Sequence, residues 1–514
     1  AFWRVAVDRR EAIDEFLHVV MYLLAYWSVS RAAVTPKRRA VIVSVLLAAG
    51  AAVIAVTLLA PLGIIPYSGT LHAGRLSGPF QYPNTLAAFC LVILLLALGR
   101  WISDRRWLVR TLMAYLSSAS FLFILGSQSR AVWVMTPVFL LVMALGLPAR
   151  RWYRAIGVWG GTLLSGLIFS RRFYTALMEG ETAQVLMHFA LLGIIALALD
   201  LLLFAYERVL GWHEAPREDQ SRYGVLGALV AAGIGSVGVM LLLGLRQDVV
   251  HWVIPASFLR RFGNVEWNDP SVLGRLDFMQ DAWTLMLRNP LLGAGGGGWN
   301  ALYHQVQPYL YWTSEVHNAF LQIAVEVGPI GLAIFLALWG WHLAAGWSLQ
   351  RRLRHPKAGK KYRSEMGRLG DKPAILHWSV LLATLAFGVH ALLDFDFSLP
   401  AMPLLLWMLW GVQEAAIREP EAAVPSEGRL PVWFQRLRTG LSIRRAASPE
   451  SFLPGEREAA PAGETNVAHR AAPRADTAPV WWSGLRLGRK LLVSLLGLSL
   501  VVSSFMLSSR LLAA

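Results

Sequence analysis

The stretch Pro83-Asn-Thr-Leu-Ala-Ala-Phe-Cys-Leu-Val-Ile-Leu-Leu-Leu-Ala-Leu-Gly99 decides the fold class of this chain. From Leu86 onward it carries only apolar or small residues, and its length approaches the roughly 20 residues that a helix needs to cross a bilayer. Hydrocarbon offers no partner to open backbone groups, so such a run is expected to be a transmembrane helix. Working outward, the same criterion predicts twelve spans. They cover 12–30, 40–62, 83–99, 111–126, 131–147, 155–170, 185–206, 223–244, 315–344, 374–393, 399–416 and 489–508.

The composition agrees with a membrane protein. Of the 514 residues, 56% are hydrophobic and only 16% are charged, whereas an average soluble domain has about 25% charged residues. This balance excludes a soluble globular enzyme, and the net charge of +16 is expected to set membrane topology rather than to bind nucleic acid. The one cysteine, Cys90, rules out a disulfide framework and a thiolate metal site. The predicted fold is an all-α polytopic membrane helix bundle of about 12 transmembrane helices, with a large external loop domain before a late span.

Lysine and arginine are unevenly distributed between the two sets of connecting segments. With alternating spans, the segments on the side of 31–39 carry 33 of these residues, and the segments on the other side carry 10. Cytoplasmic loops are enriched in Lys and Arg, so the first side is predicted to be cytoplasmic. Ala1 then falls outside, and since the chain does not begin with Met, a truncated start is expected.

Five parts follow from these spans. Residues 1–244 are predicted to form an N-terminal bundle (spans 1–8), 245–314 an external loop, 315–416 spans 9–11, 417–488 a mostly disordered cytoplasmic linker, and 489–514 the last transmembrane helix. Within the linker, 431–445 places aromatic and aliphatic residues on one helical face with arginines around them. This pattern fits an interfacial helix on anionic lipid or, equally, a solvated basic segment.

Three arginines stand out because cations are scarce on the external side. Arg75 lies in Gly74-Arg-Leu-Ser-Gly-Pro-Phe-Gln-Tyr-Pro-Asn84, whose Asn84 is predicted to cap the next helix, Arg130 ends a short loop, and Arg275 opens an amphipathic stretch. An arginine at membrane depth needs an anionic partner. That partner is either a carboxylate, a lipid headgroup or one ligand shared by all three. A diphosphate would suit guanidinium groups, which grip its oxygens in pairs. The candidate carboxylates are Asp277, Asp281, Asp394 and Asp396.

The ninth span begins near His317. A histidine at a helix entry is often only interfacial, but Asn318, Gln322 and Glu326 recur every four residues and draw a polar stripe along the expected helix. Such a stripe must face the bundle interior. It either forms interhelical hydrogen bonds or lines a polar cavity below His317.

A second polar group lies at His390-Ala-Leu-Leu-Asp-Phe-Asp396, where the tenth span reaches the external side. Asp394 and Asp396 resemble metal-holding carboxylates of nucleotide-sugar transferases, but any two acids one residue apart match that pattern. We reject the metal interpretation and predict that these acids are counter-ions to Arg75, Arg130 or Arg275.

The external loop contains a glycine run, Gly295 to Gly298, and several aromatic residues. The run lacks the Lys-Ser/Thr of a phosphate loop, so we interpret it as allowing close approach to a ligand or movement of a cap. The aromatic side chains would either stack on sugar rings or anchor the loop at the membrane interface. They are Trp299, Tyr303, Tyr309, Tyr311 and Trp312.

Taken in order, these segments resemble the superfamily of O-antigen ligases and O-antigen polymerases. The matching segments are 75–84, 127–130, 275–283 with Asn289-Pro290 and the glycine run, 317–322 with 326–331, and 390–396. The resemblance implies metal-independent, inverting transfer of a glycan from a polyprenyl diphosphate carrier, outside the cytoplasmic membrane of a bacterium. It implies that His317 is the general base and that Arg75, Arg130 and Arg275 hold the diphosphate. Asn84, Asn318, Gln322, Glu326, His390 and Asp394 would support them.

The chemistry is consistent with this assignment. A diphosphate is a good leaving group, so catalysis needs a base for the acceptor hydroxyl and fixed positive charge for the departing diphosphate. No cofactor, metal or nucleic acid is expected; the partners would be the lipid-linked donor, a glycan, lipid or protein acceptor, and membrane lipids. The alternative is a lipid-linked glycan flippase or other polytopic transporter without bond chemistry. A flippase should carry charged residues deep in several spans, and here the spans are nearly free of Arg and Lys.

Overall fold

The computed structural model describes residues 6–148, 151–209, 270–354 and 370–422. These residues form helices joined by short connections, with one small antiparallel hairpin in which Leu71 pairs with Leu76. The long helices of the first half are α2 (Arg9–Ala32), α3 (Pro36–Leu59), α4 (Pro83–Ser103), α5 (Trp107–Ser127), α6 (Arg130–Leu145), α7 (Trp152–Glu179) and α8 (Thr182–Val209).

The second half contributes helices of more varied length. They are α12 (Pro270–Arg288), α13 (Gly298–Leu302), α14 (Ala319–Glu326), α15 (Gly328–Arg354), α17 (Lys372–Ala391) and α18 (Ala401–Ala422). The hairpin strands are β1 (Leu71–His72) and β2 (Arg75–Leu76), and the 3-10 turns are η1 (Gly78–Phe80), η4 (Tyr303–Gln305) and η5 (Asp396–Ser398).

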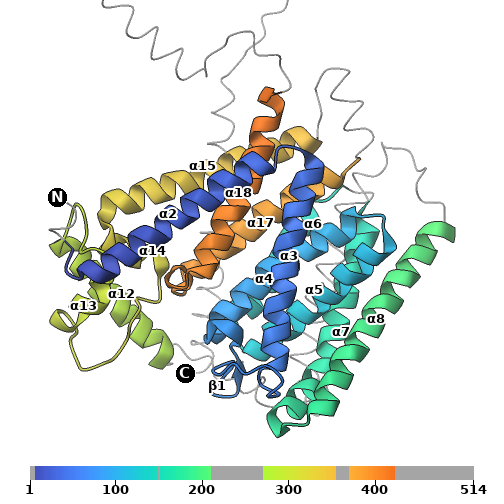
Figure 1. Cartoon of the computed structure of the whole chain (residues 1–514), viewed down its shortest axis with the longest axis horizontal. Helices are drawn as coiled ribbons and strands as arrows, with labels where there is room; N and C mark the ends of the chain where they lie inside the picture. Colours follow the sequence, from blue (N-terminus) through green and yellow to red (C-terminus); the bar gives the residue numbers. More distant parts are fainter. Residues whose placement is uncertain (1–5, 149–150, 210–269, 355–369, 423–514) are drawn as a thin grey trace, which may run out of the picture. The chain divides into compact units, whose positions relative to one another are not determined.

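Helix α4, formed by the most apolar stretch of the sequence, lies in the middle of the bundle (Figure 1). It packs most extensively against α5 and α17, and its side chains from Leu91 to Leu98 are almost completely buried. At Gly99 a Cβ atom would lie 2.5 Å from the hydroxyl of Ser379, so this glycine lets α17 approach closely. Cys90 is likewise a core residue. The central helix is therefore shielded by protein, and its neighbours provide the outer apolar surface.

The polytopic helical fold is confirmed. Seven described helices are long and apolar enough to cross a membrane, namely α2, α3, α4, α5, α8, α15 and α17. Two predicted spans, 223–244 and 489–508, and the candidate interfacial helix 431–445 lie outside the described residues. A helix occurs at each of the other predicted spans, and the total of twelve stays a prediction.

The span predicted over 315–344 is wrong as a single helix. Asn318 caps α14, which begins at Ala319 and ends at Glu326. The helix breaks there, and Gly328, with φ of 80°, is the first residue of α15. A Cβ atom on Gly328 would lie 2.3 Å from the carbonyl oxygen of Leu291, and one on Gly293 would lie 2.5 Å from the Gly328 nitrogen. Two backbones therefore cross here, and glycine on both sides makes the crossing possible.

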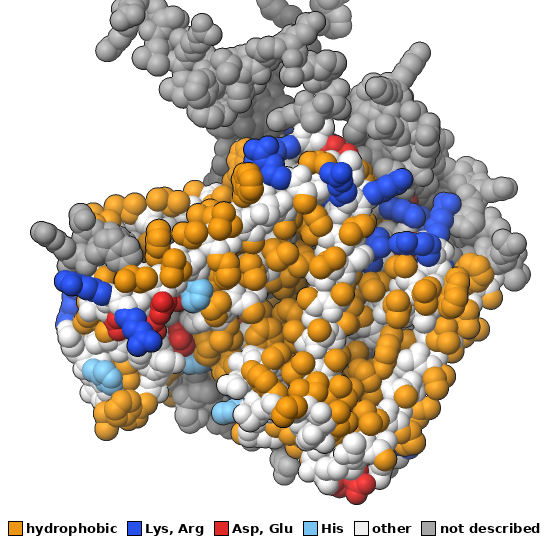
Figure 2. Space-filling model, viewed as in Figure 1, with side chains coloured by type: hydrophobic (Ala, Val, Ile, Leu, Met, Phe, Trp, Pro, Cys, Tyr) orange, Lys and Arg blue, Asp and Glu red, His pale blue; other side chains and the backbone are white. Residues whose placement is uncertain are grey.

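The surface divides into an apolar region and charged ends. Figure 2 shows one face on which hydrophobic side chains cover most of the helices, while many Lys and Arg side chains gather along one edge. Inside the bundle, Arg110 and Asp200 form a buried ion pair with an N–O distance of 2.8 Å, and the Trp101 indole donates to the same carboxylate. A broad apolar surface with cations at one border is the pattern expected of helices in a bilayer.

Candidate active site

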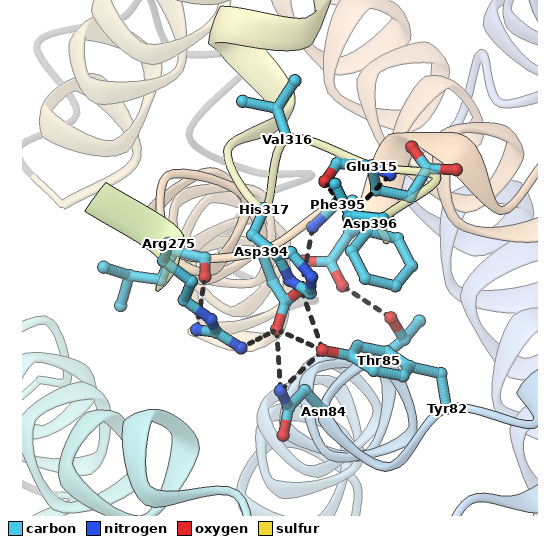
Figure 3. A network of polar contacts seen from close by, with 12 residues as sticks. Tyr82, Asn84, Thr85, Arg275, Glu315, Val316, His317, Asp394, Phe395 and Asp396 are labelled. Carbon is cyan, nitrogen blue, oxygen red and sulfur yellow. Dashed lines mark hydrogen bonds and ion pairs between the residues drawn. The ribbon is translucent and has the colours of Figure 1, made fainter. Parts of the chain in front are cut away.

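Asp394 is the centre of a polar network between α4, α12 and α14 (Figure 3). It follows α17, and only 1% of its side chain is exposed. One carboxylate oxygen lies 3.1 Å from Nδ1 of His317. The other accepts from Asn84 at 2.7 Å and from Arg275 at 3.3 Å, while the Tyr82 hydroxyl lies 3.2 Å from both oxygens. Residues from four distant parts of the sequence thus meet at one carboxylate.

The backbone around His317 fixes the direction of its ring. His317 has φ of 58°, a left-handed conformation that costs a non-glycine residue free energy. The next residue, Asn318, caps α14 by accepting from the Phe320 and Leu321 amides. The Ala319 amide donates to the backbone carbonyl of Asp394 at 3.1 Å. The histidine and its carboxylate partner are therefore joined through both side chain and main chain.

The predicted polar stripe supports this turn. The side-chain oxygen of Gln322 accepts from the Val316 amide at 3.3 Å, and its amide group lies 3.4 Å from Glu326. Gln322 also interacts with the Glu315 side chain, and Glu326 interacts with the backbone of Gly297. The observed role of these contacts is to hold the segment that carries His317.

Electrostatics keep Asp394 ionised. Burial alone would raise the pKa of its carboxyl group, but the hydrogen bond with His317 and the charge of Arg275 outweigh burial and hold the pKa well below its ordinary value of 3.8. Burial and the nearby Asp394 charge raise the pKa of the Tyr82 phenol, so this hydroxyl remains a donor at neutral pH. The prediction that Asp394 is a counter-ion to Arg275 is confirmed.

Arg275 approaches this carboxylate from α12. One guanidinium nitrogen donates to the Leu393 carbonyl at 2.9 Å and another to Asp394. About 30% of the side chain is exposed. A guanidinium group has five N–H donors, and these two hydrogen bonds hold it beside the His317–Asp394 pair.

Arg75 joins the same network through Asn84. Its Nε donates to the Ser127 carbonyl at 2.8 Å, and a terminal nitrogen donates to the Asn84 side-chain oxygen at 2.8 Å. Asn84 was expected to cap α4, and this is wrong. It is the second residue of that helix and bridges Arg75 to Asp394 instead. Arg130 is the first residue of α6, three positions after Ser127, so the structure brings its backbone close to the Arg75 end of the network.

A second histidine–carboxylate pair, His390 with Asp396, lies near the His317–Asp394 pair. Asp396 is fully buried; one of its oxygens lies 2.5 Å from Nδ1 of His390 and the other accepts from Thr85 at 3.0 Å. Its observed partner is thus a histidine, and not one of the three arginines named in the sequence analysis. In the same turn, Ser398 donates to Glu315 at 2.6 Å. These contacts fix the turn that carries Asp394.

The roles of Tyr82 and Thr85 were not predicted from the sequence. Both lie in or directly after the segment 75–84 that was singled out for its arginine. The available signal was their position at the start of a helix whose neighbours were already candidates. Their partners are more than 300 residues away, which the spacing of a single sequence does not reveal.

The glycine run packs against α2. A Cβ atom on Gly295 would lie 2.6 Å from that of Ala6, and one on Gly297 would lie 2.5 Å from the Glu11 side chain. The Val7 amide donates to the Ala294 carbonyl at 2.9 Å. The run therefore allows close contact with the first turn of α2, and its roles in ligand approach or cap movement remain predictions.

The fold and the site define a multi-pass helical membrane protein with a histidine–carboxylate pair beside an arginine. Residues 115–336 match the family model described as O-antigen ligase. This match supports the assignment of the chain to the O-antigen ligase superfamily, as the sequence motifs indicated, and it indicates an O-antigen ligase-like membrane enzyme. A search of curated proteins found no match. The matched region contains Arg130, Arg275 and His317, whereas Asn84 and Asp394 lie on either side of it.

Proposed function

We propose that the protein is a glycosyltransferase of the external face of a bacterial cytoplasmic membrane. It moves a glycan from a polyprenyl diphosphate carrier to an acceptor hydroxyl, without a metal and with inversion at the anomeric carbon. The observation that carries this proposal is the 3.1 Å contact between His317 and Asp394, with Arg275 on the same carboxylate. The superfamily membership gives the membrane setting and the lipid-linked class of donor.

In this proposal His317 is the general base. Asp394 accepts a hydrogen bond from Nδ1–H of His317, which leaves Nε2 with a lone pair for the acceptor hydroxyl. As the acceptor oxygen bonds to the anomeric carbon, its proton passes to Nε2, and the carboxylate stabilises the imidazolium that forms. Deprotonation of His317 by solvent then restores the base.

The leaving group is the lipid diphosphate. Its bond to the anomeric carbon breaks as the acceptor oxygen attacks from the opposite face, so the configuration inverts. The diphosphate departs as an anion and needs no acid to protonate it. Arg275, Arg75 and Arg130 supply the fixed positive charge, and such a donor typically contributes on the order of 10²- to 10³-fold to the rate.

The test is transfer by the purified full chain in nanodiscs with a polyprenyl diphosphate-linked glycan. We expect His317→Asn to lower kcat by about 10²- to 10⁴-fold, because a general base is lost. Asparagine accepts the left-handed backbone better than alanine does, and its amide still reaches Asp394. Loss of turnover would therefore not come from misfolding.

A matched control is His18→Asn, a partly exposed histidine of α2, which should keep wild-type turnover. Turnover by His317→Asn equal to that of wild type would end the base assignment. Chelator should leave wild-type turnover unchanged. The size distribution of products, a ladder or a single addition, would separate a polymerase from a ligase or a protein oligosaccharyltransferase.

A further inference from the structure

A row of aromatic rings leads away from His317. The Phe278 ring of α12 stacks on the His317 imidazole with centroids 5.9 Å apart, and Tyr311 follows Phe278 at 4.8 Å. Tyr309 lies edge-on to Tyr311 at 5.6 Å, and Trp312 follows next in the chain. We call Phe278, Tyr309, Tyr311 and Trp312 the aromatic ledge. The candidate base is thus one end of a row of aromatic rings, and Trp312 joins this row through His304 and Tyr303.

The ledge rests on a rigid base. Tyr311 stacks on the buried Tyr303, which stacks in turn on the buried Trp299. Tyr309 donates to Asp277 at 2.5 Å, and Tyr311 donates to Asp281. These acids are one helical turn apart on α12, so the segment is fastened at two points. Such a surface loses little entropy when it binds a partner.

The outer part of the ledge faces away from the protein. Trp312 is 78% exposed and Tyr309 is 52% exposed. The Trp312 ring is held edge-on by His304, with centroids 5.4 Å apart, and His304 is itself hydrogen-bonded to Gln307. The neighbours of Trp312 therefore hold its ring in place but leave most of it exposed.

The chemistry of the ledge favours a saccharide. Aromatic faces pack on the C–H faces of sugar rings, while carboxylates accept hydrogen bonds from sugar hydroxyls. The Asp277 carboxylate can accept about four hydrogen bonds, of which Tyr309 supplies one. The same carboxylates repel a diphosphate, and a bilayer disfavours them. The ledge therefore fits a neutral polyhydroxyl chain better than either the carrier headgroup or lipid.

We propose that the aromatic ledge binds the acceptor saccharide and leads its reacting hydroxyl to His317. This inference rests on the proposed function, because it assigns the acceptor to the side of the base. The donor's diphosphate binds to the arginines, whereas the acceptor gives up its proton and must therefore contact the His317 imidazole. The ledge begins at that ring and carries acids instead of arginines.

The kinetic test uses Trp312→Ala in nanodiscs. We expect the acceptor KM to rise about tenfold, as the loss of one aromatic contact implies, while kcat and the donor KM stay within about twofold of wild type. Trp341→Ala is the matched control, since Trp341 of α15 is also well exposed but lies in a candidate membrane span. An acceptor KM for Trp312→Ala equal to that of wild type would overturn the proposal.

A second measurement tests the membrane-anchor alternative. Cys90 is the one cysteine and is buried, so Trp312→Cys and Trp341→Cys can each be labelled with bimane. We expect iodide to quench the label at 312 and brominated phosphatidylcholine to quench the label at 341. Quenching at 312 by the brominated lipid would show that the ledge lies in the bilayer and would overturn the proposal.

A third measurement separates this inference from the proposed function. The protein is applied to an array of lipid-free bacterial oligosaccharides. Wild type and His317→Asn are expected to bind, and Trp312→Ala is expected to bind about tenfold more weakly. If wild type binds saccharide without transferring it, the transferase proposal fails and the ledge stands. If wild type transfers glycan with no binding and no change in the KM of Trp312→Ala, the ledge fails alone.

Discussion

Asp394 shows how much one buried carboxylate can organise. It contacts His317, Arg275, Asn84 and Tyr82 while almost completely hidden from solvent. Burying a charge is unfavourable unless it is paired and hydrogen-bonded, and this carboxylate has both kinds of partner. The network therefore depends on Asp394 staying ionised, which makes its response to pH a direct test.

Acid is expected to weaken the fold through Asp394. Its pKa in the folded protein lies below the ordinary value of 3.8, so its ionised form contributes stability above that pH and loses it as the pH falls further. Thermal unfolding of wild type in detergent should therefore steepen its pH dependence below about pH 4. Asp394→Asn should lack that part of the dependence. Parallel curves for the two proteins from pH 6 to pH 3 would contradict this view of the network.

Several site residues could be found from the sequence because their residue types are unusual for their surroundings. His317, Arg275 and Asp394 stand out as polar groups next to apolar runs, and they meet in space. Asn84 was misjudged, because local spacing fits a helix cap as well as a bridge to a carboxylate 310 residues away. Long-range partners leave no trace in local spacing.

At the level of elements, the break between α14 and α15 positions the site. It separates the short helix that follows His317 from the long candidate span, and it occurs where residues 291–293 cross the turn. Hydropathy predicted an uninterrupted helix because the residues on both sides of the break are mostly apolar, although Gly328-Pro329 is a pair typical of a helix boundary. The chain that crosses at residues 291–293 explains the need for glycine at position 328.

Gly328→Ala should destabilise the protein markedly. Alanine at φ of 80° is strained, a cost of about 1–3 kcal/mol, and its Cβ would overlap the Leu291 carbonyl. Gly328→Ala is therefore expected to have a clearly lower unfolding temperature than wild type. Gly340→Ala is the matched control within α15, because a Cβ there meets nothing within 4 Å; it should be neutral or slightly stabilising. Equal unfolding temperatures for the two variants would refute the crossing argument.

For the whole molecule, the uneven distribution of charge carries the prediction of orientation. The fold class followed from the length of the apolar runs, since only helices or closed barrels satisfy the backbone in lipid. The expected external loop 245–314 and the cytoplasmic side remain predictions. In this predicted orientation the network around Asp394 lies on the external side of the membrane. Arg105, an exposed residue between α4 and α5, lies on the cytoplasmic side.

Cysteine labelling can test this orientation. Leu310→Cys and Arg105→Cys are treated with a membrane-impermeant maleimide in spheroplasts. We expect Leu310→Cys to react at once, since position 310 is highly exposed, and Arg105→Cys to react only after lysis. Wild type, with its buried Cys90, is the unlabelled control. The reverse pattern would place the site inside and end the proposal of an external transferase.

The bridge from Arg75 through Asn84 to Asp394 also bears on biogenesis. A ribosome must add about 310 residues after Asn84 before the carboxylate that this amide needs has been synthesised. Until then the early helices carry Arg75 and Asn84 without their carboxylate partner, even when these helices are fully inserted. The nascent polypeptide thus remains inert through most of its translation, and competence is acquired in a late step, when the translocon delivers α17 to its place beside α4.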